Sequence, residues 1–281
     1  MRIAVTGATG KLGRAVVQRL RDSGHTVIGL DLVGARGPGF TQVDLTDYGQ
    51  TVDALFGIND RHNGLDAVVH LAAAPAGGIL PDSQTFHNNM AATFNVFQGA
   101  RRAGIKTIVY ASSETVLGLP FETPPPYLPV DEEYETRPES IYSLTKHLEE
   151  QLAIKLVRWD PELSITGLRF SNVMDTGDYA AFPAYDSDSA TRKWNLWGYI
   201  DARDGAQAVE RALALGKPGF EAYIIAAADT VMSRSSAELV AEVFPSVTVR
   251  KELGEHETLL SIDKAKRVLG YEPQHSWREH G

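Results

Sequence analysis

Short apolar runs alternate with stretches of helical periodicity over the first two thirds of the chain. The apolar runs predict strands at residues 3–5, 26–30, 67–71, 107–111 and 163–170, with a weaker strand at 40–43. Apolar residues at helical spacing predict helices from Leu12, over residues 83–103 and over residues 142–159. Parallel strands need crossover connections, and right-handed crossovers place helices on both faces of a sheet. The pattern therefore predicts a doubly wound α/β fold around a parallel sheet.

The alternation weakens after residue 170. Residues 175–188 are rich in Asp, Gly, Ser and Tyr, and regular signals resume with a strand at 196–200, a helix at 202–215, a strand at 222–226 and a helix at 263–269. Residues 119–140 hold six prolines and a run of acidic residues, and proline opposes helix at its own position and in the preceding residue. We expect residues 119–140 to form a surface loop, and the C-terminal pieces to form a small discontinuous part.

Glycines stand at Gly7, Gly10 and Gly13, directly after the first predicted strand and at the start of the first helix. Glycine permits a tight turn and the close approach of a pyrophosphate, and the N-terminus of a helix offers free N–H groups to an anion. Thr9, Lys11 and Leu12 lie in the same turn. The turn predicts a dinucleotide site, and a tight turn without a ligand is the alternative.

Asp31 ends the second predicted strand, 18 residues after Gly13. A carboxylate at that place accepts hydrogen bonds from both ribose hydroxyls of an adenosine and repels a 2′-phosphate. Arg36 is close enough along the chain to bind a 2′-phosphate, although a solvated loop charge is the favoured interpretation. Asp31 therefore favours NAD over NADP.

Tyr142 and Lys146 stand four residues apart on a predicted helix, and so lie on one face of it. A nearby ammonium stabilises a phenolate and lowers the tyrosine pKa from about 10, which suits Tyr142 to act as a general base. Ser113 follows the fifth predicted strand, at the edge where doubly wound sheets bind ligands, and can hold a substrate oxygen against the tyrosine. An ordinary surface pair is the alternative for Tyr142 and Lys146.

With these residues in this order, the chain resembles the extended short-chain dehydrogenase/reductase family, which includes nucleotide-sugar epimerases and dehydratases. The resemblance covers nearly the whole chain. It implies that Tyr142 is the acid/base, that Lys146 lowers the pKa of Tyr142 and holds the nicotinamide ribose, and that Ser113 polarises the reacting oxygen. It also implies further contacts to NAD, at Asp44, Leu45, Leu71, Ala72, Ala73, Asn89, Ala111, Phe170, Asn172 and Val173.

The resemblance also implies a division of the chain. Residues 1–171 are expected to form a Rossmann-type NAD-binding domain to which residues 199–227 return. Residues 172–198 and 228–281 are expected to form a small substrate-binding part. In the family, the helix that carries the tyrosine joins a two-fold interface of four helices, and the apolar character of residues 141–157 on more than one face agrees with a homodimer.

The substrate part is short and poor in basic residues. Only 21 residues separate Asn172 from Trp194, whereas nucleotide-sugar enzymes of the family carry a much longer insertion there. Its basic residues are Arg192 and Lys193, and four aspartates lie nearby, so a dianionic diphosphate would be repelled. In this respect the chain is similar to the compact uronate dehydrogenases, which oxidise free sugar acids with NAD.

The preferred hypothesis is therefore an NAD-dependent oxidoreductase that acts on a small free sugar, sugar acid or polyol, with Tyr142 as base. A sugar or nucleotide-sugar epimerase or dehydratase is the alternative, since those reactions also begin with hydride abstraction. A non-catalytic dinucleotide sensor is a third possibility, which loss of the Tyr–Lys pair would mark, and both residues are present.

Six residues are candidates for substrate contacts, namely Ala74, Pro75, Ser113, Glu114, Asn172 and Arg192. Arg192 would pair with a substrate carboxylate or form a structural salt bridge. Glu114 would accept hydrogen bonds from sugar hydroxyls and disfavour a nearby carboxylate. Trp194, Trp197 and Tyr199 offer an apolar platform for a sugar, or belong to the core.

Composition narrows the choice of partners and compartment. The 281 residues carry a formal net charge of −9, which opposes binding to nucleic acid and to anionic membrane surfaces. The chain has no cysteine, which excludes disulfides and thiolate metal sites, and its eight histidines show no metal-ligand spacing, so no metal is expected. No signal segment and no apolar run long enough for a bilayer is evident, so a cytoplasmic protein is expected.

Overall fold

A computed structural model of the chain describes residues 1–35, 37, 39–57 and 63–280. Its centre is a seven-stranded sheet in the order β10-β7-β5-β4-β1-β2-β3, in which every neighbouring pair is parallel. The strands are β1 (Arg2–Thr6), β2 (Thr26–Asp31), β3 (Phe40–Gln42), β4 (Ala67–His70), β5 (Thr107–Ser113), β7 (Ser164–Phe170) and β10 (Gly219–Ile225). The order reverses between β1 and β4, so the predicted doubly wound α/β fold is confirmed.

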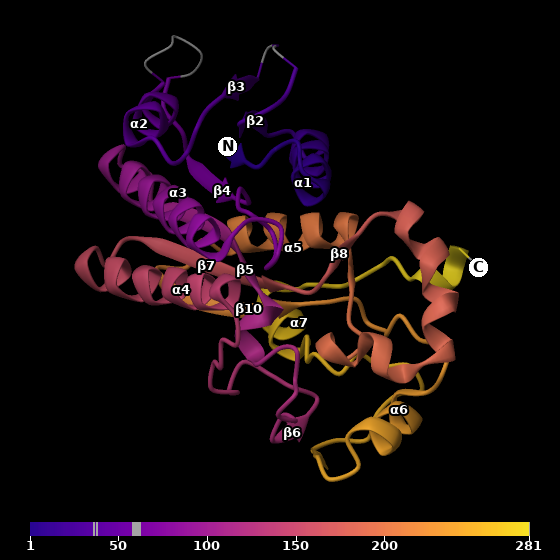
Figure 1. The fold of residues 1–281 in the computed structure, drawn as a ribbon. Coiled ribbons are helices and arrows are strands. Elements are labelled where there is room, and N and C mark those ends of the chain that lie inside the picture. The colour runs from indigo at the N-terminus through magenta and orange to yellow at the C-terminus, as the bar shows by residue number, and fades with distance from the viewer. Residues whose placement is uncertain (36, 38, 58–62, 281) are drawn as a thin grey trace.

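Helices cover both faces of this sheet (Figure 1). They are α1 (Lys11–Asp22), α2 (Tyr48–Phe56), α3 (Asp82–Arg102), α4 (Ile141–Trp159), α5 (Ala202–Leu215), α6 (Ser236–Val243) and α7 (Asp263–Leu269). Helix α3 packs against α2 and α4, whereas α1 packs against α5. Ile3 and Val5 of β1 join one hydrophobic cluster and Ala4 joins the other, because successive side chains of a strand point to opposite faces.

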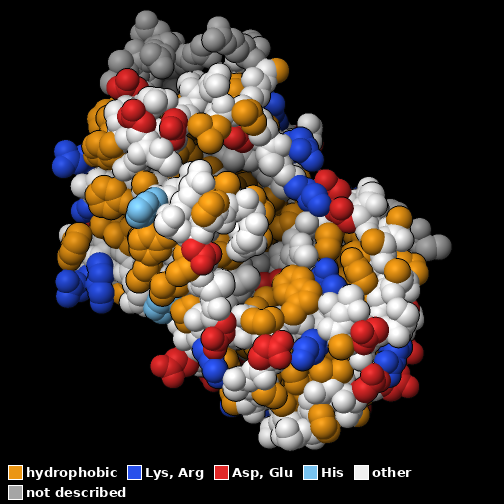
Figure 2. Space-filling model, in the orientation of Figure 1, with side chains coloured by type: hydrophobic (Ala, Val, Ile, Leu, Met, Phe, Trp, Pro, Cys, Tyr) orange, Lys and Arg blue, Asp and Glu red, His pale blue; other side chains and the backbone are white. Residues whose placement is uncertain are grey.

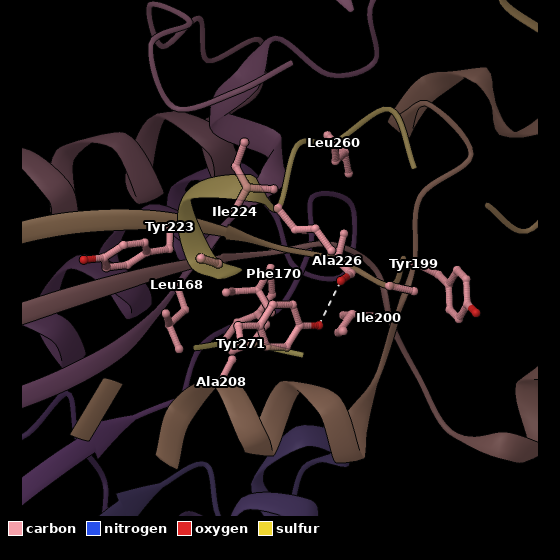
Figure 3. Close-up of a cluster of buried hydrophobic side chains, with 14 of the residues drawn as sticks. Leu168, Phe170, Tyr199, Ile200, Ala208, Tyr223, Ile224, Ala226, Leu260 and Tyr271 are labelled. Atoms are coloured by element: carbon pink, nitrogen blue, oxygen red, sulfur yellow. Dashed lines mark hydrogen bonds between the residues drawn. The ribbon is translucent and has the colours of Figure 1, made fainter. Parts of the chain in front are cut away.

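Short elements complete the chain. Two further two-stranded parallel pairs are β6 (Tyr127–Leu128) with β11 (Thr248–Val249), and β8 (Val173–Met174) with β9 (Ile200–Asp201). The 3₁₀ helices are η1 (Glu114–Leu117), η2 (Thr176–Ser187), η3 (Ser189–Asn195) and η4 (Trp277–His280). Figure 3 shows where the end of the chain joins the sheet: Tyr271 donates a hydrogen bond of 2.8 Å to the carbonyl of Ala226, beside the buried side chains of β7 and β10.

The prediction that residues 119–140 form a surface loop is wrong in one respect. Its prolines prevent a long helix, but Leu119, Phe121, Leu128 and Val130 are buried in the main hydrophobic cluster. Strand β6 lies within this segment and pairs with β11, so apolar residues between the prolines tie the segment to the C-terminal part. Proline content predicted the irregular backbone and gave no information about burial.

The prediction of a strand over residues 196–200 is also largely wrong. Leu196 and Trp197 have φ values of 55° and 56° where η3 ends, and only Ile200–Asp201 forms a strand, β9. Trp197 and Tyr199 are fully buried, so they belong to the core. Residues 175–188, which interrupted the alternation, largely form η2.

The apolar residues at helical spacing that predicted a helix over residues 83–103 do not all face the core, although the helix itself forms as α3. Phe97 is fully buried, whereas Phe94 is 48% exposed. The buried face of the helix instead includes Ala92, Val96 and Ala100. In the part of the chain that the structure describes, no helix is long and apolar enough to cross a membrane, and no three acidic, histidine or cysteine side chains gather as a metal site would require.

Candidate active site

A cavity of about 780 Å³ opens at the carboxyl ends of β1, β2, β4, β5 and β7. Doubly wound sheets bind ligands at this edge, where the strand order reverses. Most of the residues singled out from the sequence line it: Gly7, Thr9, Gly10, Lys11, Leu12, Gly13, Asp31, Asp44, Leu45, Leu71, Ala72, Ala73, Pro75, Ala111, Ser113, Glu114, Tyr142, Lys146, Phe170, Asn172 and Val173. Separate segments of the sequence therefore meet around one cavity.

The turn between β1 and α1 requires glycine at two positions. Gly7 has φ +64°, and a Cβ on it would lie 2.8 Å from the backbone nitrogen of Ala72. A Cβ on Gly13 would lie only 2.0 Å from the carbonyl oxygen of Gly7. Gly10 caps α1 without a side chain, so the first N–H groups of the helix remain available to a ligand at the cavity. The turn fits the pyrophosphate of a dinucleotide.

Asp31 is fixed at the end of β2 by its neighbours. Its Oδ2 accepts hydrogen bonds from the backbone N–H and the hydroxyl of Thr9, at 2.9 and 2.7 Å, and its Oδ1 accepts one from the Leu32 N–H at 2.8 Å. The carboxylate therefore has a defined place at the cavity edge, as ribose recognition requires. Arg36, which was weighed against it, lies outside the described residues.

Replacement of Asp31 by alanine should weaken the preference for NAD over NADP. Loss of a charge-assisted acceptor should reduce NAD affinity roughly ten- to hundredfold. Loss of its negative charge should also remove the repulsion of a 2′-phosphate. Dissociation constants of both dinucleotides, measured by fluorescence titration, give the ratio. Asp53→Ala, a change at an exposed aspartate of α2, is the matched control and should leave the ratio unchanged. An unchanged ratio in Asp31→Ala would contradict the assignment of Asp31.

Tyr142 and Lys146 lie in the first turns of α4. Ser140 caps this helix, and a reciprocal pair of hydrogen bonds with Ser143 fixes where it begins. The Nζ atom of Lys146 lies 6.0 Å from the centroid of the Tyr142 ring. Burial raises the pKa of Tyr142, while the charge of Lys146 and a hydrogen bond from Ser113 lower it. The three predicted catalytic residues therefore act on one another at one edge of the cavity.

A buried network supports this edge from behind. Glu150 forms a bidentate pair with Arg169 of β7, at 2.9 and 2.8 Å, and also accepts a hydrogen bond of 2.6 Å from Ser112. The pair links α4 to the end of β7, and the hydrogen bond from Ser112 links α4 to the end of β5. It holds the strand that carries Ser113 against the helix that carries Tyr142.

Three residues predicted to contact ligands do not line the cavity. Asn89 instead exchanges two hydrogen bonds with the backbone of Ala74, at 2.8 and 3.1 Å, and so shapes the loop that follows β4. Ala74 is itself buried. Arg192 is buried too: it donates to the carbonyl of Gly198 at 3.0 Å and lies over the Trp194 ring, 5.0 Å from the centroid. Arg192 is therefore placed within the protein instead of at the cavity.

Trp194, expected to belong to an apolar platform or to the core, also lines the cavity. The remaining lining residues were not singled out from the sequence. Many of them directly adjoin predicted ones, as Thr46 adjoins Leu45, Thr115 adjoins Glu114 and Ser171 adjoins Phe170. Because these segments leave the ends of strands, the position just after each strand was the available signal. Ser140 had a different signal, since it lies two residues before the predicted helix start at 142 and serine is a preferred N-cap.

Glu114 gives the substrate end of the cavity a buried carboxyl. It is 2% exposed, and its Oε1 accepts a hydrogen bond from Asn195 Nδ2 at 3.2 Å. Its Oε2 has no hydrogen-bond partner among the described residues. Burial raises the pKa of Glu114 to about 7, although Ser171, Asn195 and Arg192 act to lower it.

Positive charge is scarce around the cavity. Among the described residues, Lys11 and Lys146 are the cations that line it. Lys11 Nζ lies 2.6 Å from Asp178, and Lys146 Nζ lies 3.0 Å from Glu149. Lys193, outside the lining, lies 3.7 Å from Glu122. Each of these ammonium groups therefore has a carboxylate partner.

Comparison with curated proteins finds relatives that match part of this chain. UDP-glucose 4-epimerase of Caenorhabditis elegans is 31% identical over 199 residues, which cover 61% of this chain and 54% of the relative. UDP-glucose 4-epimerase of Bacillus subtilis (strain 168) is 32% identical over 187 residues, which cover 61% and 52%. The chain thus spans about half the length of the curated relatives it matches.

Solved structures match nearly the whole chain. A UDP-galactose 4-epimerase superposes with a TM-score of 0.71 at 26% identity, covering 99% of this chain and 95% of that one. A short-chain dehydrogenase/reductase superfamily protein of Agrobacterium tumefaciens with bound NAD gives 0.74 at 24% identity, covering 99% and 94%. A mutated uronate dehydrogenase gives 0.68 at 23% identity, covering 99% and 84%. The last two matches, at 24% and 23% identity, show similarity of the fold alone.

A family model extends the evidence beyond individual relatives. Residues 3–226 match the model of the NAD dependent epimerase/dehydratase family. This range contains the glycine turn, Asp31, and the group of Ser113, Tyr142 and Lys146. The match confirms the family expected from the sequence and, with it, the expected dinucleotide. The chain therefore belongs to the NAD dependent epimerase/dehydratase family.

Proposed function

We propose that the protein catalyses hydride transfer at a hydroxyl-bearing carbon of a sugar, with epimerisation as the overall reaction. The observation that carries this proposal is the meeting of Ser113, Tyr142 and Lys146 at one edge of a cavity whose other end fits a dinucleotide. A non-catalytic sensor would not need this group, and its presence disfavours that possibility.

The residues divide the chemistry among them. NAD, when bound, supplies the hydride acceptor. Ser113 holds the reacting hydroxyl of the sugar, and Tyr142 takes the proton from that oxygen. Lys146 stabilises the phenolate because its positive charge lowers the pKa of Tyr142. The glycine turn and Asp31 hold the dinucleotide at its phosphates and ribose.

Epimerisation has more support than the net oxidation that was preferred from the sequence. The curated relatives reported above are UDP-glucose 4-epimerases at about 30% identity. In an epimerase the hydride taken from the sugar returns to it, so the cofactor remains bound and no net NADH accumulates.

Net oxidation of a free sugar is a second candidate, and the charge of the cavity favours it. The lining cations are both paired with carboxylates, and Arg192 is buried and does not line the cavity. A diphosphate placed near Glu114 would have no unpaired cation to meet it among the described lining residues. This arrangement supports a neutral sugar without a nucleotide. Residues 172–198 and 228–281 remain our proposal for the substrate-binding part, and of these Asn172, Val173 and Trp194 line the cavity.

The two candidates differ in their products. The purified protein, supplied with NAD, is incubated separately with free sugars and with UDP-hexoses, and products are followed by NADH absorbance and by NMR of the sugar. An epimerase gives a new sugar epimer without net NADH. A dehydrogenase gives NADH in step with oxidised sugar. Absence of both outcomes across the panel would contradict the proposed function.

Glu114 should make stability depend on pH. Burial raises the pKa of its carboxyl from 4.5 to about 7, so the folded protein retains a proton that the unfolded chain has already released. That contribution to stability is present at low pH and is lost as the pH rises towards the folded pKa. The melting temperature of the wild type should therefore fall relative to that of Glu114→Gln between about pH 5 and about pH 8.

Thermal unfolding followed by circular dichroism measures this difference. Glu122→Gln is the matched control, since the Glu122 side chain is 76% exposed, and its melting temperature should follow that of the wild type. A constant difference between the wild type and Glu114→Gln at all pH values would contradict a titrating Glu114.

We propose further that the protein forms a homodimer through α3 and α4. Figure 2 shows hydrophobic side chains gathered over these helices, where Phe94 is 48% and Trp159 is 61% exposed. Pairing of two copies would cover this surface, and Phe94→Glu should prevent it because a charge would be buried. Light scattering should give about twice the chain mass of 30.6 kDa for the wild type and a single chain for the variant. A monomeric wild type would contradict the proposal.

A further inference from the structure

Glu149 is a buried carboxylate beside the proposed catalytic lysine, and the chemistry above does not use it. It is 0% exposed, and its Oε2 lies 3.0 Å from Nζ of Lys146, three residues earlier on α4. A buried ion pair contributes little net stability, because desolvation of both charges opposes their attraction. The position of this pair beside Tyr142 therefore suggests a role in the reaction.

Glu149 helps to fix the direction of the lysine ammonium. A lysine has three N–H donors. The carbonyl of Ala111 accepts one at 2.9 Å, and Glu149 accepts a second at 3.0 Å. Lys146 lines the cavity, so the third N–H is left for the ligand side. Without Glu149, the ammonium would keep only one protein partner among these contacts.

A directed row of hydrogen bonds runs from the loop after β4 to Thr93, a residue that acts on Glu149. The hydroxyl oxygen of Thr6 accepts from two backbone N–H groups of that loop, at 3.1 and 3.2 Å, so its own hydrogen goes to His70 Nδ1 at 2.8 Å. Burial lowers the pKa of His70 to about 3, so the ring is neutral and its remaining N–H, on Nε2, donates to Thr93 Oγ1 at 3.1 Å. The hydrogen of the Thr93 hydroxyl is then available to Glu149, whose Oε1 has no hydrogen-bond partner among the described residues.

Other charges act on the same group. Burial raises the pKa of Glu149, and Lys146 and the Thr93 hydroxyl oppose that rise. Burial raises the pKa of Tyr142 most; Lys146 lowers it, and Glu149 raises it further. The titratable and charged groups that surround Tyr142, Lys146 and Glu149 are Glu150 on α4, Glu114 on η1, His70 on β4, Tyr110 on β5 and Arg169 on β7.

We propose that Glu149 is a positioning residue, which keeps Lys146 charged and aims its third N–H into the cavity towards Tyr142 and the cofactor ribose. This inference rests on the proposed function, in which Tyr142 takes a proton from the sugar. The negative charge of Glu149 also offsets part of the effect of Lys146 on the tyrosine.

Glu149→Gln tests this role, because glutamine keeps the size and an acceptor oxygen but removes the charge. The charge of Lys146 then acts undiminished on Tyr142, so the phenolate forms at lower pH. Lys146, still buried, also loses its proton at lower pH. Both limbs of the pH profile of kcat/KM should therefore move down, each by roughly one pH unit. A purely structural role would lower the melting temperature and leave both limbs in place.

A titration without substrate separates this inference from the proposed function. The tyrosinate absorbance of the NAD-loaded protein, minus that of the same protein with Tyr142→Phe, reports the pKa of Tyr142 alone. Glu149→Gln should lower this pKa by roughly one unit, and Glu150→Gln, which removes the partner of Arg169, should lower it much less. No shift in a folded Glu149→Gln, or an equal shift in Glu150→Gln, would overturn the inference.

If Glu149→Gln does not fold, Glu149→Asp moves the carboxylate one methylene away from Lys146 and should give a smaller shift in the same direction. If no sugar reacts with the wild type, the proposed function fails. The tyrosinate titration then still decides whether Glu149 acts on Lys146 and Tyr142.

Discussion

Tyr142→Phe should reduce hydride transfer by roughly 10²- to 10⁴-fold. Phenylalanine fills the same space but cannot take a proton from the substrate oxygen. The ring lies in the first turn of α4, next to Lys146 and Ser113, so the change removes one hydroxyl and leaves the surrounding contacts in place. Rates are measured from sugar products by NMR and from NADH absorbance.

The reduction should appear in kcat and not in dinucleotide binding. NAD affinity, measured by fluorescence titration, should stay within about threefold of the wild type, since the glycine turn and Asp31 are untouched. Tyr127→Phe is a matched control, because Tyr127 donates to Asp131 on a segment that does not line the cavity. Full activity in Tyr142→Phe would exclude Tyr142 as the base.

Gly13→Ala should abolish dinucleotide binding and lower stability. A Cβ at this position would lie 2.0 Å from the carbonyl oxygen of Gly7, which is backbone and can only move with the turn itself. Overpacking of this kind typically costs about 1–3 kcal/mol, and a displaced turn no longer presents the N–H groups of α1 to a pyrophosphate. Thermal unfolding and NAD titration measure the two effects.

Gly177→Ala is the control for this substitution. A Cβ there meets nothing within 4 Å, so both the melting temperature and NAD affinity should match the wild type. If Gly13→Ala bound NAD like the wild type, the glycine turn could not be the pyrophosphate site.

The fold and the centre of the site could be predicted because both depend on local patterns. Apolar runs marked the strands, and residues just after those strands must meet at one edge of a parallel sheet. This reasoning brought Gly7, Asp31 and Ser113 to one cavity. Tyr142 and Lys146 joined them because helical spacing fixes their shared face.

Contacts between distant segments could not be predicted in this way. The burial of residues 119–140 depends on pairing with Thr248–Val249, more than a hundred residues later. Arg192 has a suitable charge for a substrate carboxylate, yet stacking on Trp194 and the carbonyl of Gly198 hold it inside the protein. Glu149 resembles any acidic residue of a surface helix until the structure places it against Lys146.

The most direct test of the central claim mixes the NAD-loaded protein with single sugars from a panel of free sugars and UDP-hexoses and follows NADH absorbance rapidly, in the wild type and in Tyr142→Phe. Both candidate reactions begin with the same step, so at least one sugar should produce NADH on the wild type, transiently or in net amount, and none should do so on the variant. A wild type that binds NAD but forms no NADH with any sugar, or a variant that forms it as fast, would contradict Tyr142-dependent hydride transfer from a sugar.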